Sequence, residues 1–174
     1  MAATPPSTST FSPNMYAAFG DKEALYLKSL ERYVALLIER NAAALNEEPD
    51  GRRAVAGFLR SLAEVLADPA LPGGCFIING TADCGGSTIP ASVEMALRAA
   101  LQADEDNLRQ RLQRAQDEGD LPGDAKPAAL AAMFGSIVAG LAVLAKSGAG
   151  RAKLDMVIDA AMAVWPAAGR TGVQ

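Results

Sequence analysis

The feature that most constrains the fold is a stretch without charge at residues 128–145, AALAAMFGSIVAGLAVLA. A helix with this sequence has no polar face, so it needs cover on more than one side. The stretch is near the lower length limit for crossing a bilayer. It is rich in Ala and Gly, however, and nothing else in the chain has the length or flanks of a membrane span. We therefore expect a buried helix and no membrane contact, with a membrane span as the alternative.

The cover for this helix is expected from its neighbour in the sequence and from a second chain. A helix at about 151–165 is close enough to lie antiparallel beside it. Two such helices from each of two chains would form a four-helix bundle with two-fold symmetry. Four small residues would let the backbones approach closely: Gly135, Ser136, Ala139 and Gly140. The alternative is a monomeric bundle with helix 127–146 at its centre. The residues predicted at the dimer interface are Phe134, Ile137, Val138, Leu141, Leu144, Val157, Ile158 and Trp165.

Apolar residues at helical spacing continue through the rest of the chain. Aromatic residues are 5% of the sequence, and Ala and Leu take their place, which favours packed helices over sheets. The short apolar run 75–79 has a pattern that fits a strand or a buried helix. No other segment is available to pair with it, so we predict a short helix there and an all-α fold. The predicted helices are 22–45, 50–67, 75–79, 90–118, 127–146 and 151–165.

The absence of histidine excludes most catalytic chemistry. Without an imidazole the chain has no Ser-His-Asp or Cys-His arrangement and no His-ligated zinc. Its two cysteines, Cys75 and Cys84, are too few for a disulfide framework or a zinc site, and we expect free thiols. The glycine-rich segment 85–88 lacks the pattern of a phosphate-binding loop. We therefore predict no catalytic residue, no metal site and no cofactor. The first twelve residues do not form a signal peptide, which favours the cytoplasm.

The acidic run in the helix 90–118 contains one residue of interest. Asp104 falls on the apolar stripe, four residues before Leu108. It either lines a polar spot in a pocket or marks where the helix leaves the core, since an unpaired Asp is rarely buried. Glu105 is expected to face solvent, with Arg109 one turn later as its partner.

Residues 12–34, SPNMYAAFGDKEALYLKSLERYV, carry the clearest family signal. The segments MYAAF and GDKEAL at 15–25 resemble the end of the DNA-binding domain in TetR/AcrR-type transcriptional regulators. In that family the recognition helix ends in Leu-Tyr-x-x-Phe, and Gly-Ser/Asp-Lys-Glu-x-Leu opens the next helix. The run GGCFIIN at 73–79, the long helix after it and the two apolar C-terminal helices stand in the order of the family's ligand-binding and dimerisation domain.

The resemblance implies how the chain would meet DNA. Asn14 would contact a base edge, and Tyr16 and Lys22 would contact phosphates. Two further helices of the helix-turn-helix would need about 30 residues, but only thirteen residues precede Asn14. Residues 1–46 also carry equal numbers of basic and acidic residues, and phosphate contacts supply most non-specific affinity. The DNA-binding domain is therefore expected to be incomplete, with weak or absent operator binding in this form.

The function that follows is that of a dimeric TetR-like regulator, more specifically a repressor that responds to a small apolar effector. The alternative is a dimeric ligand-binding or interaction module that has lost operator binding. The effector would bind between the helices 50–67, 75–83 and 90–118. The pocket residues predicted there are Phe58, Leu62, Met95 and Asp104. The predicted divisions are a disordered leader (1–13), a remnant of the DNA-binding domain with its connecting helix (14–46), a ligand-binding and dimerisation domain (47–166) and a loose tail (167–174).

Overall fold

The computed structural model describes residues 20–166. In this part of the chain the fold consists of six helices without a strand, which confirms the predicted all-α class. The short apolar run after Cys75 is a helix and not a strand. The helices are α2 (Lys22–Asn46), α3 (Gly51–Leu66), α4 (Phe76–Thr81), α5 (Ala91–Asp117), α6 (Pro127–Lys146) and α7 (Arg151–Met162).

Local signals set the starts of the first two helices. The Asp21 carboxylate accepts a hydrogen bond of 2.8 Å from the backbone N–H of Ala24. The Asp50 carboxylate accepts one of 2.7 Å from the N–H of Arg53. Each bond satisfies a backbone donor that the helix itself leaves unpaired. Gly20 precedes the first of these caps with φ of 85°, a conformation that favours glycine.

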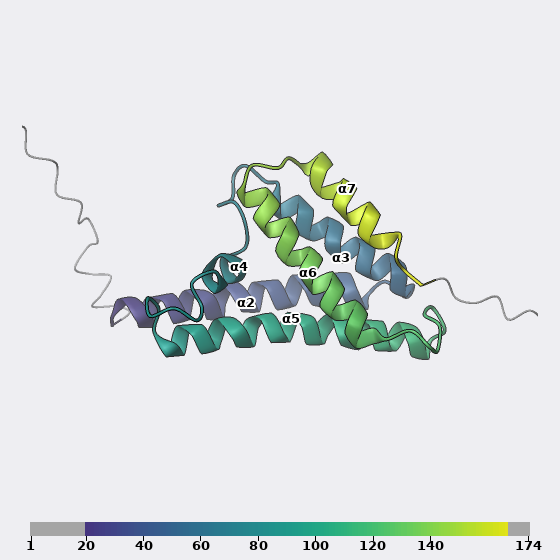
Figure 1. Cartoon of the computed structure of the whole chain (residues 1–174), viewed down its shortest axis with the longest axis horizontal. Helices are drawn as coiled ribbons and strands as arrows, with labels where there is room; N and C mark the ends of the chain where they lie inside the picture. Colours follow the sequence, from purple (N-terminus) through teal and green to yellow (C-terminus); the bar gives the residue numbers. More distant parts are fainter. Residues whose placement is uncertain (1–19, 167–174) are drawn as a thin grey trace, which may run out of the picture.

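The helices form two layers (Figure 1). The long helices α2 and α5 lie side by side and run in the same direction. Ser92 hydrogen-bonds Glu23 near their first turns, and Arg114 donates to the Asn46 carbonyl near their last turns. Helices α3, α6 and α7 form the second layer, and the short α4 lies against α2, α5 and α6. The core lies between the layers and continues among α3, α6 and α7 within the second layer. Side chains from five helices are fully buried in it: Leu59, Ile77, Leu97, Leu108, Leu112, Phe134, Leu141, Leu154 and Ile158.

Helix α6 is only partly covered within one chain. By length and composition it is the one helix among the described residues that would suit a membrane span, and 22% of its most apolar window is buried. A core helix of a water-exposed protein passes the same test. Along its exposed side lie Ala132, Ser136, Gly140 and Val143, spaced by three and four residues.

The structure corrects the predicted dimer interface at three positions. Phe134, Leu141 and Ile158 have no exposed surface, because they pack into the core of their own chain. Such side chains have no accessible surface with which to contact a second chain. The other five candidates are half-buried: Ile137, Val138, Leu144, Val157 and Trp165.

Candidate ligand-binding site

A cavity of about 330 Å3 lies between α3, α4, α5 and α6. Its volume falls at the low end of the range of about 300–1,000 Å3 that is usual for small-molecule sites. The side chains around it are mostly apolar. The cavity is lined by Phe58, Cys75, Ile77, Ile78, Thr81, Leu101, Asp104, Glu105, Leu108, Ala132, Gly135, Ser136, Val138 and Ala139.

Two of the four predicted pocket residues line this cavity, and two do not. Phe58 and Asp104 are in its wall. Leu62 lies one turn further along α3 and is buried in the core. Met95 is 70% exposed, because it lies between Val93 and Leu97 in sequence and those two point into the core. The prediction for Leu62 and Met95 is therefore wrong for this cavity.

Helix α6 supplies part of the wall that sequence reasoning missed. Gly135, Ser136 and Ala139 were expected to allow close approach of two backbones, but here they border open space. A Cβ built on Gly135 would meet no atom within 4 Å. Ala132 and Ser136 are also exposed, so the cavity opens to the surface along this part of α6.

Asp104 is half-buried and reaches toward α2 as well as the cavity. Burial raises the pKa of its carboxyl, while a hydrogen bond from the Asn41 side chain and the nearby Arg40 guanidinium act in the opposite direction. Asn41 is itself 7% exposed, so this is a contact inside the protein. Of the two sequence interpretations, the structure therefore supports a polar spot in a pocket wall.

The sequence suggested that Glu105 faces solvent with Arg109 as its partner, and the structure shows a different arrangement. Glu105 lines the cavity and is half-buried. Arg109 instead pairs with Asp106, at 3.1 Å. Asp104 and Glu105 are consecutive residues of α5, and both line the cavity. The wall therefore carries two carboxylates.

Helix α4 connects the cavity wall to α2. Its residues Ile77, Ile78 and Thr81 line the cavity. The Phe76 ring packs between two tyrosines of α2, with centroids 5.0 Å from Tyr26 and 5.7 Å from Tyr33.

Cys75, at the start of α4, adds a polar contact to this connection. The Tyr33 hydroxyl lies 3.5 Å from Cys75 Sγ, to which it donates a hydrogen bond. Burial and this bond raise the pKa of Tyr33. Cys75 and Cys84 are both free thiols, as predicted. Any displacement of α4 at the cavity would therefore also act on α2.

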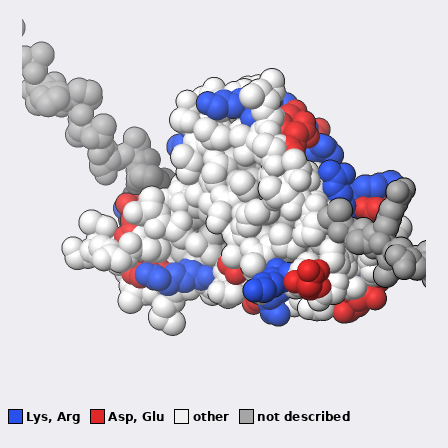
Figure 2. Space-filling model, turned by 45° about the vertical axis from the view of Figure 1, so that its right-hand side comes forward, with Lys and Arg blue, Asp and Glu red and all other residues white. Residues whose placement is uncertain are grey.

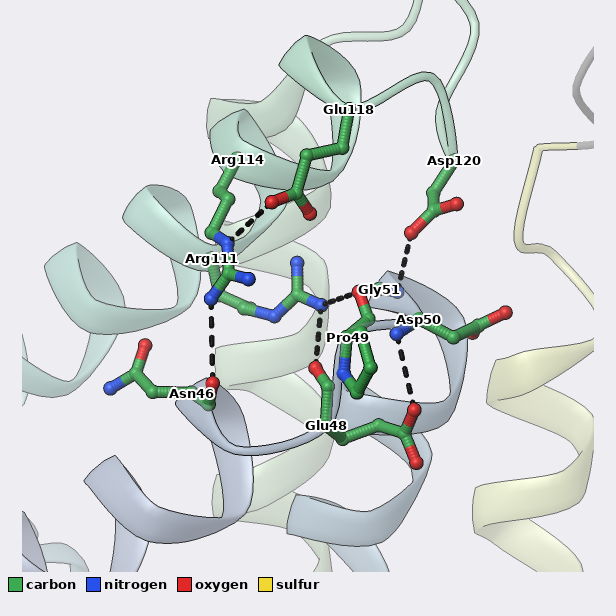
Figure 3. A network of polar contacts seen from close by, with 9 residues as sticks. All are labelled: Asn46, Glu48, Pro49, Asp50, Gly51, Arg111, Arg114, Glu118 and Asp120. Carbon is green, nitrogen blue, oxygen red and sulfur yellow. Dashed lines mark hydrogen bonds and ion pairs between the residues drawn. The ribbon is translucent and has the colours of Figure 1, made fainter.

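A polar network fixes the junction between α2 and α3 (Figure 3). Arg111 of α5 is 2% exposed, and its Nη2 donates to the carbonyl oxygens of Glu48 and Pro49, at 3.1 and 2.9 Å. The N–H of Gly51 donates to Asp120 Oδ2 at 2.7 Å. Burial lowers the pKa of Arg111. The signal for this buried charge was in the sequence: Arg111 falls on the apolar stripe three residues after Leu108.

The remaining predicted sites are placed as follows. Lys22 is exposed at the first residue of α2. Asn14 and Tyr16 lie outside the described residues. Within residues 20–166, no group of three or more Cys, Asp and Glu side chains is arranged to hold a metal ion.

Comparison with known proteins places this architecture. The family model for the C-terminal domain of tetracyclin repressor-like proteins matches residues 51–161. The HTH-type transcriptional repressor ComR of Escherichia coli (strain K12) is 28% identical over 161 residues, which are 92% of this chain and 76% of ComR.

Solved structures agree with that match. CifR, a TetR family transcriptional regulator solved as a cysteine mutant with 26-bp double-strand operator DNA, is 30% identical with a TM-score of 0.82, over 89% of this chain and 80% of that chain. A protein from Rhodococcus sp. RHA1 assigned to the TetR transcriptional regulators is 33% identical with a TM-score of 0.66, over 90% and 82% of the two chains. These relatives are regulators of transcription. The chain belongs to the TetR family of transcriptional regulators.

Proposed function

We propose that the chain is a homodimeric repressor that binds operator DNA and is released when a small, largely apolar molecule occupies the cavity. The observation that carries this proposal is the cavity wall on α4, which is joined to α2 through Phe76. Support for DNA binding and repression comes from relatives: ComR is a transcriptional repressor, and CifR was solved with operator DNA.

The proposed route from ligand to DNA uses three short steps. A ligand pressing on Ile77 or Ile78 would move α4, since this helix has only six residues. Phe76 would carry that movement to Tyr26 and Tyr33 of α2. Lys22, at the start of α2, is the proposed phosphate contact in this part of the chain, so a shift of α2 changes how it meets DNA.

The proposed dimer face is revised to the exposed side of the two C-terminal helices. Val143 of α6 and Met156 of α7 are 57% and 70% exposed, and Gly140 is exposed one turn before Val143 on α6. The centre of the molecular face in Figure 2 has no charged side chain, and the charges gather at its edges. An uncharged surface that exposes Val143 and Met156 favours association with a second copy.

The dimer proposal is tested by a charge placed in the centre of this face. Gly140→Glu adds a carboxylate where a new Cβ meets no atom within 4 Å, so the single chain has room for it. Gly57→Glu is the matched control, since Gly57 is also an exposed helical glycine with open space. Sedimentation should show a dimer for the natural chain and the control, and an 18.0 kDa monomer for Gly140→Glu. A dimer that survives Gly140→Glu would place the interface elsewhere.

Operator binding is tested by mobility shift with DNA from upstream of the chain's own gene. We expect a complex that weakens strongly between about 50 and about 200 mM salt, because phosphate contacts release counterions. Lys22→Gln should weaken the complex and lower the salt dependence, whereas Lys153→Gln, on the exposed side of α7, should not.

A second candidate function is a dimeric ligand-binding module without operator binding. It is favoured by the charge of residues 1–46, in which four basic and four acidic residues balance. The absence of any salt-sensitive complex in the mobility shift, together with retained ligand binding, would select this candidate. Under the first function, residues 14–46 serve DNA contact and connection. Under either function, residues 47–166 serve ligand binding and dimerisation, in a cytoplasmic protein.

A further inference from the structure

The hydrogen-bonding character of the cavity wall is one-sided. Thr81 Oγ1 donates its hydrogen to the Ile78 carbonyl at 2.8 Å, and Ser136 Oγ donates to the Ala132 carbonyl at 2.9 Å. Each hydroxyl therefore uses its only hydrogen in a bond within its own helix, and it can act toward a ligand only as a hydrogen-bond acceptor. The sulfur of Cys75 accepts from Tyr33.

The charges of the wall have the same bias. Asp104 and Glu105 line the cavity, and no Lys or Arg among the described residues does. Asp104 is held from the α2 side by Asn41, with Arg40 nearby. Glu105 has no hydrogen bond or ion pair with any described residue, although it is half-buried. An unpaired carboxylate beside an apolar cavity is costly unless a cation or donor reaches it.

We propose that the cavity binds a small amine with an apolar body. The protonated nitrogen lies between Asp104 and Glu105, and the hydrocarbon part packs against Phe58, Ile77 and Leu108. This inference rests on the proposed function, because it specifies the effector of that site.

Other ligand classes fit the wall less well. A carboxylic acid would bring a third negative charge into a space whose described lining has no cation and no free hydroxyl donor. A neutral hydrocarbon would displace water from both carboxylates without offering them a hydrogen-bond donor. An ammonium group satisfies both, since each of its hydrogens can be donated to a carboxylate or hydroxyl oxygen. It also lowers the cost of ionising Asp104 inside the protein.

The test is isothermal titration calorimetry of the full chain with ligands that share one body. Phenethylamine, phenethyl alcohol and phenylacetate differ at the polar end, and hexylamine adds an aliphatic body. We expect both amines to bind, the alcohol to bind on the order of ten-fold or more weakly, and phenylacetate to give no heat of binding. Phenylacetate binding as tightly as phenethylamine, or neither amine binding at millimolar concentration, would overturn the proposal.

Variants locate the amine. The double variant Asp104→Asn and Glu105→Gln should weaken phenethylamine on the order of ten-fold to a hundred-fold and leave the alcohol nearly unchanged. Asp106→Asn is the matched control, because Asp106 is the next acid on α5 and does not line the cavity. Gly135→Leu, which fills open space at the wall, should abolish binding of all probes. Amine binding that survives the double variant or Gly135→Leu would refute the assignment.

The test of the ligand class is independent of the test of the proposed function. Calorimetry contains no DNA, so the amine specificity does not depend on operator binding. An amine that binds in the cavity but fails to release an operator complex in the mobility shift would count against the proposed regulation and leave the ligand class intact.

Discussion

The junction between α2 and α3 should be unusually intolerant of a single added methyl group. A Cβ built on Gly51 would lie 2.4 Å from the Cβ of Ala115, 3.3 Å from Arg111 Nη1 and 3.4 Å from Asp120 Oδ2. The first of these contacts is far shorter than real side chains show. Both carbons are fixed directly to helix backbones, so no rotamer change relieves the overlap, and α3 has to move away from α5.

The size of the effect follows from what that movement breaks. Overpacking of a filled site costs about 1–3 kcal/mol. Separation of the helices also stretches the 2.7 Å bond from the Gly51 N–H to Asp120, in a network where a net bond contributes about 1 kcal/mol. The reduced freedom of the unfolded chain returns about 0.4–1 kcal/mol. We expect Gly51→Ala to lower the free energy of unfolding by about 2 kcal/mol, or the melting temperature by roughly 4–8 °C.

A control and a second-site change make the reasoning specific. Gly57 lies in the same helix, and a Cβ there meets nothing within 4 Å, so Gly57→Ala should stabilise by about 0.5–1 kcal/mol. Ala115→Gly alone should cost about 1–2 kcal/mol, from lost helix propensity and a lost buried methyl. Combined with Gly51→Ala it removes the overlap, and the double variant should lie within about 1 kcal/mol of the natural chain, a coupling of about 2–4 kcal/mol.

The measurement is urea unfolding at one fixed protein concentration, since self-association would make stability depend on concentration. Equal effects of Gly51→Ala and Gly57→Ala would contradict the packing argument. So would additive behaviour of Gly51→Ala and Ala115→Gly within about 0.5 kcal/mol.

Three further outcomes are expected. Because burial raises the pKa of Asp104, ionising it costs stability, so the natural chain should lose stability relative to Asp104→Asn as pH rises from below about 4 to neutrality; a constant difference in urea unfolding across this range would contradict it. Gly80→Ala should destabilise by about 1–3 kcal/mol, because the new Cβ lies 2.6 Å from Tyr26 Oη, and an unchanged melting temperature would argue against close packing of α4 on α2. Cys84, half-buried, should react with a thiol reagent faster than buried Cys75 in the native protein, and equal rates would show that α4 opens readily.

Most of the fold was predictable because its determinants are local. The apolar stripe of a helix such as α3 is written into a few successive turns, and the caps Asp21 and Asp50 act within three residues. The junction network was not foreseen, although Arg111 stood on an apolar stripe. Its partners are carbonyl groups more than sixty residues away, and a sequence pattern does not show which carbonyls a fold will present.

Helix α6 shows where local pattern stops being informative. Its apolar residues surround the whole helix, so the sequence has no polar side from which to read the buried direction. The large residues Phe134 and Leu141 were assigned to a second chain, but they face their own core. The prediction failed because size and hydrophobicity, without a polar reference, fix that a side chain is buried and not what buries it.

The small residues of α6 make the same point for the candidate site. Gly135 and Ala139 permit either close approach of two helices or empty space between them, and the outcome depends on what stands opposite. Here the small residues face a space that is also lined by Phe58 and Leu108 of other helices, and the missing side-chain volume is part of the cavity. The cavity also explains the position of Asp104. On the apolar stripe of an isolated helix, an aspartate interrupts the core. Beside the cavity, it is a polar group in the wall of a ligand-sized space. The candidate site therefore arises from the packing of four helices and belongs to no single segment of the sequence.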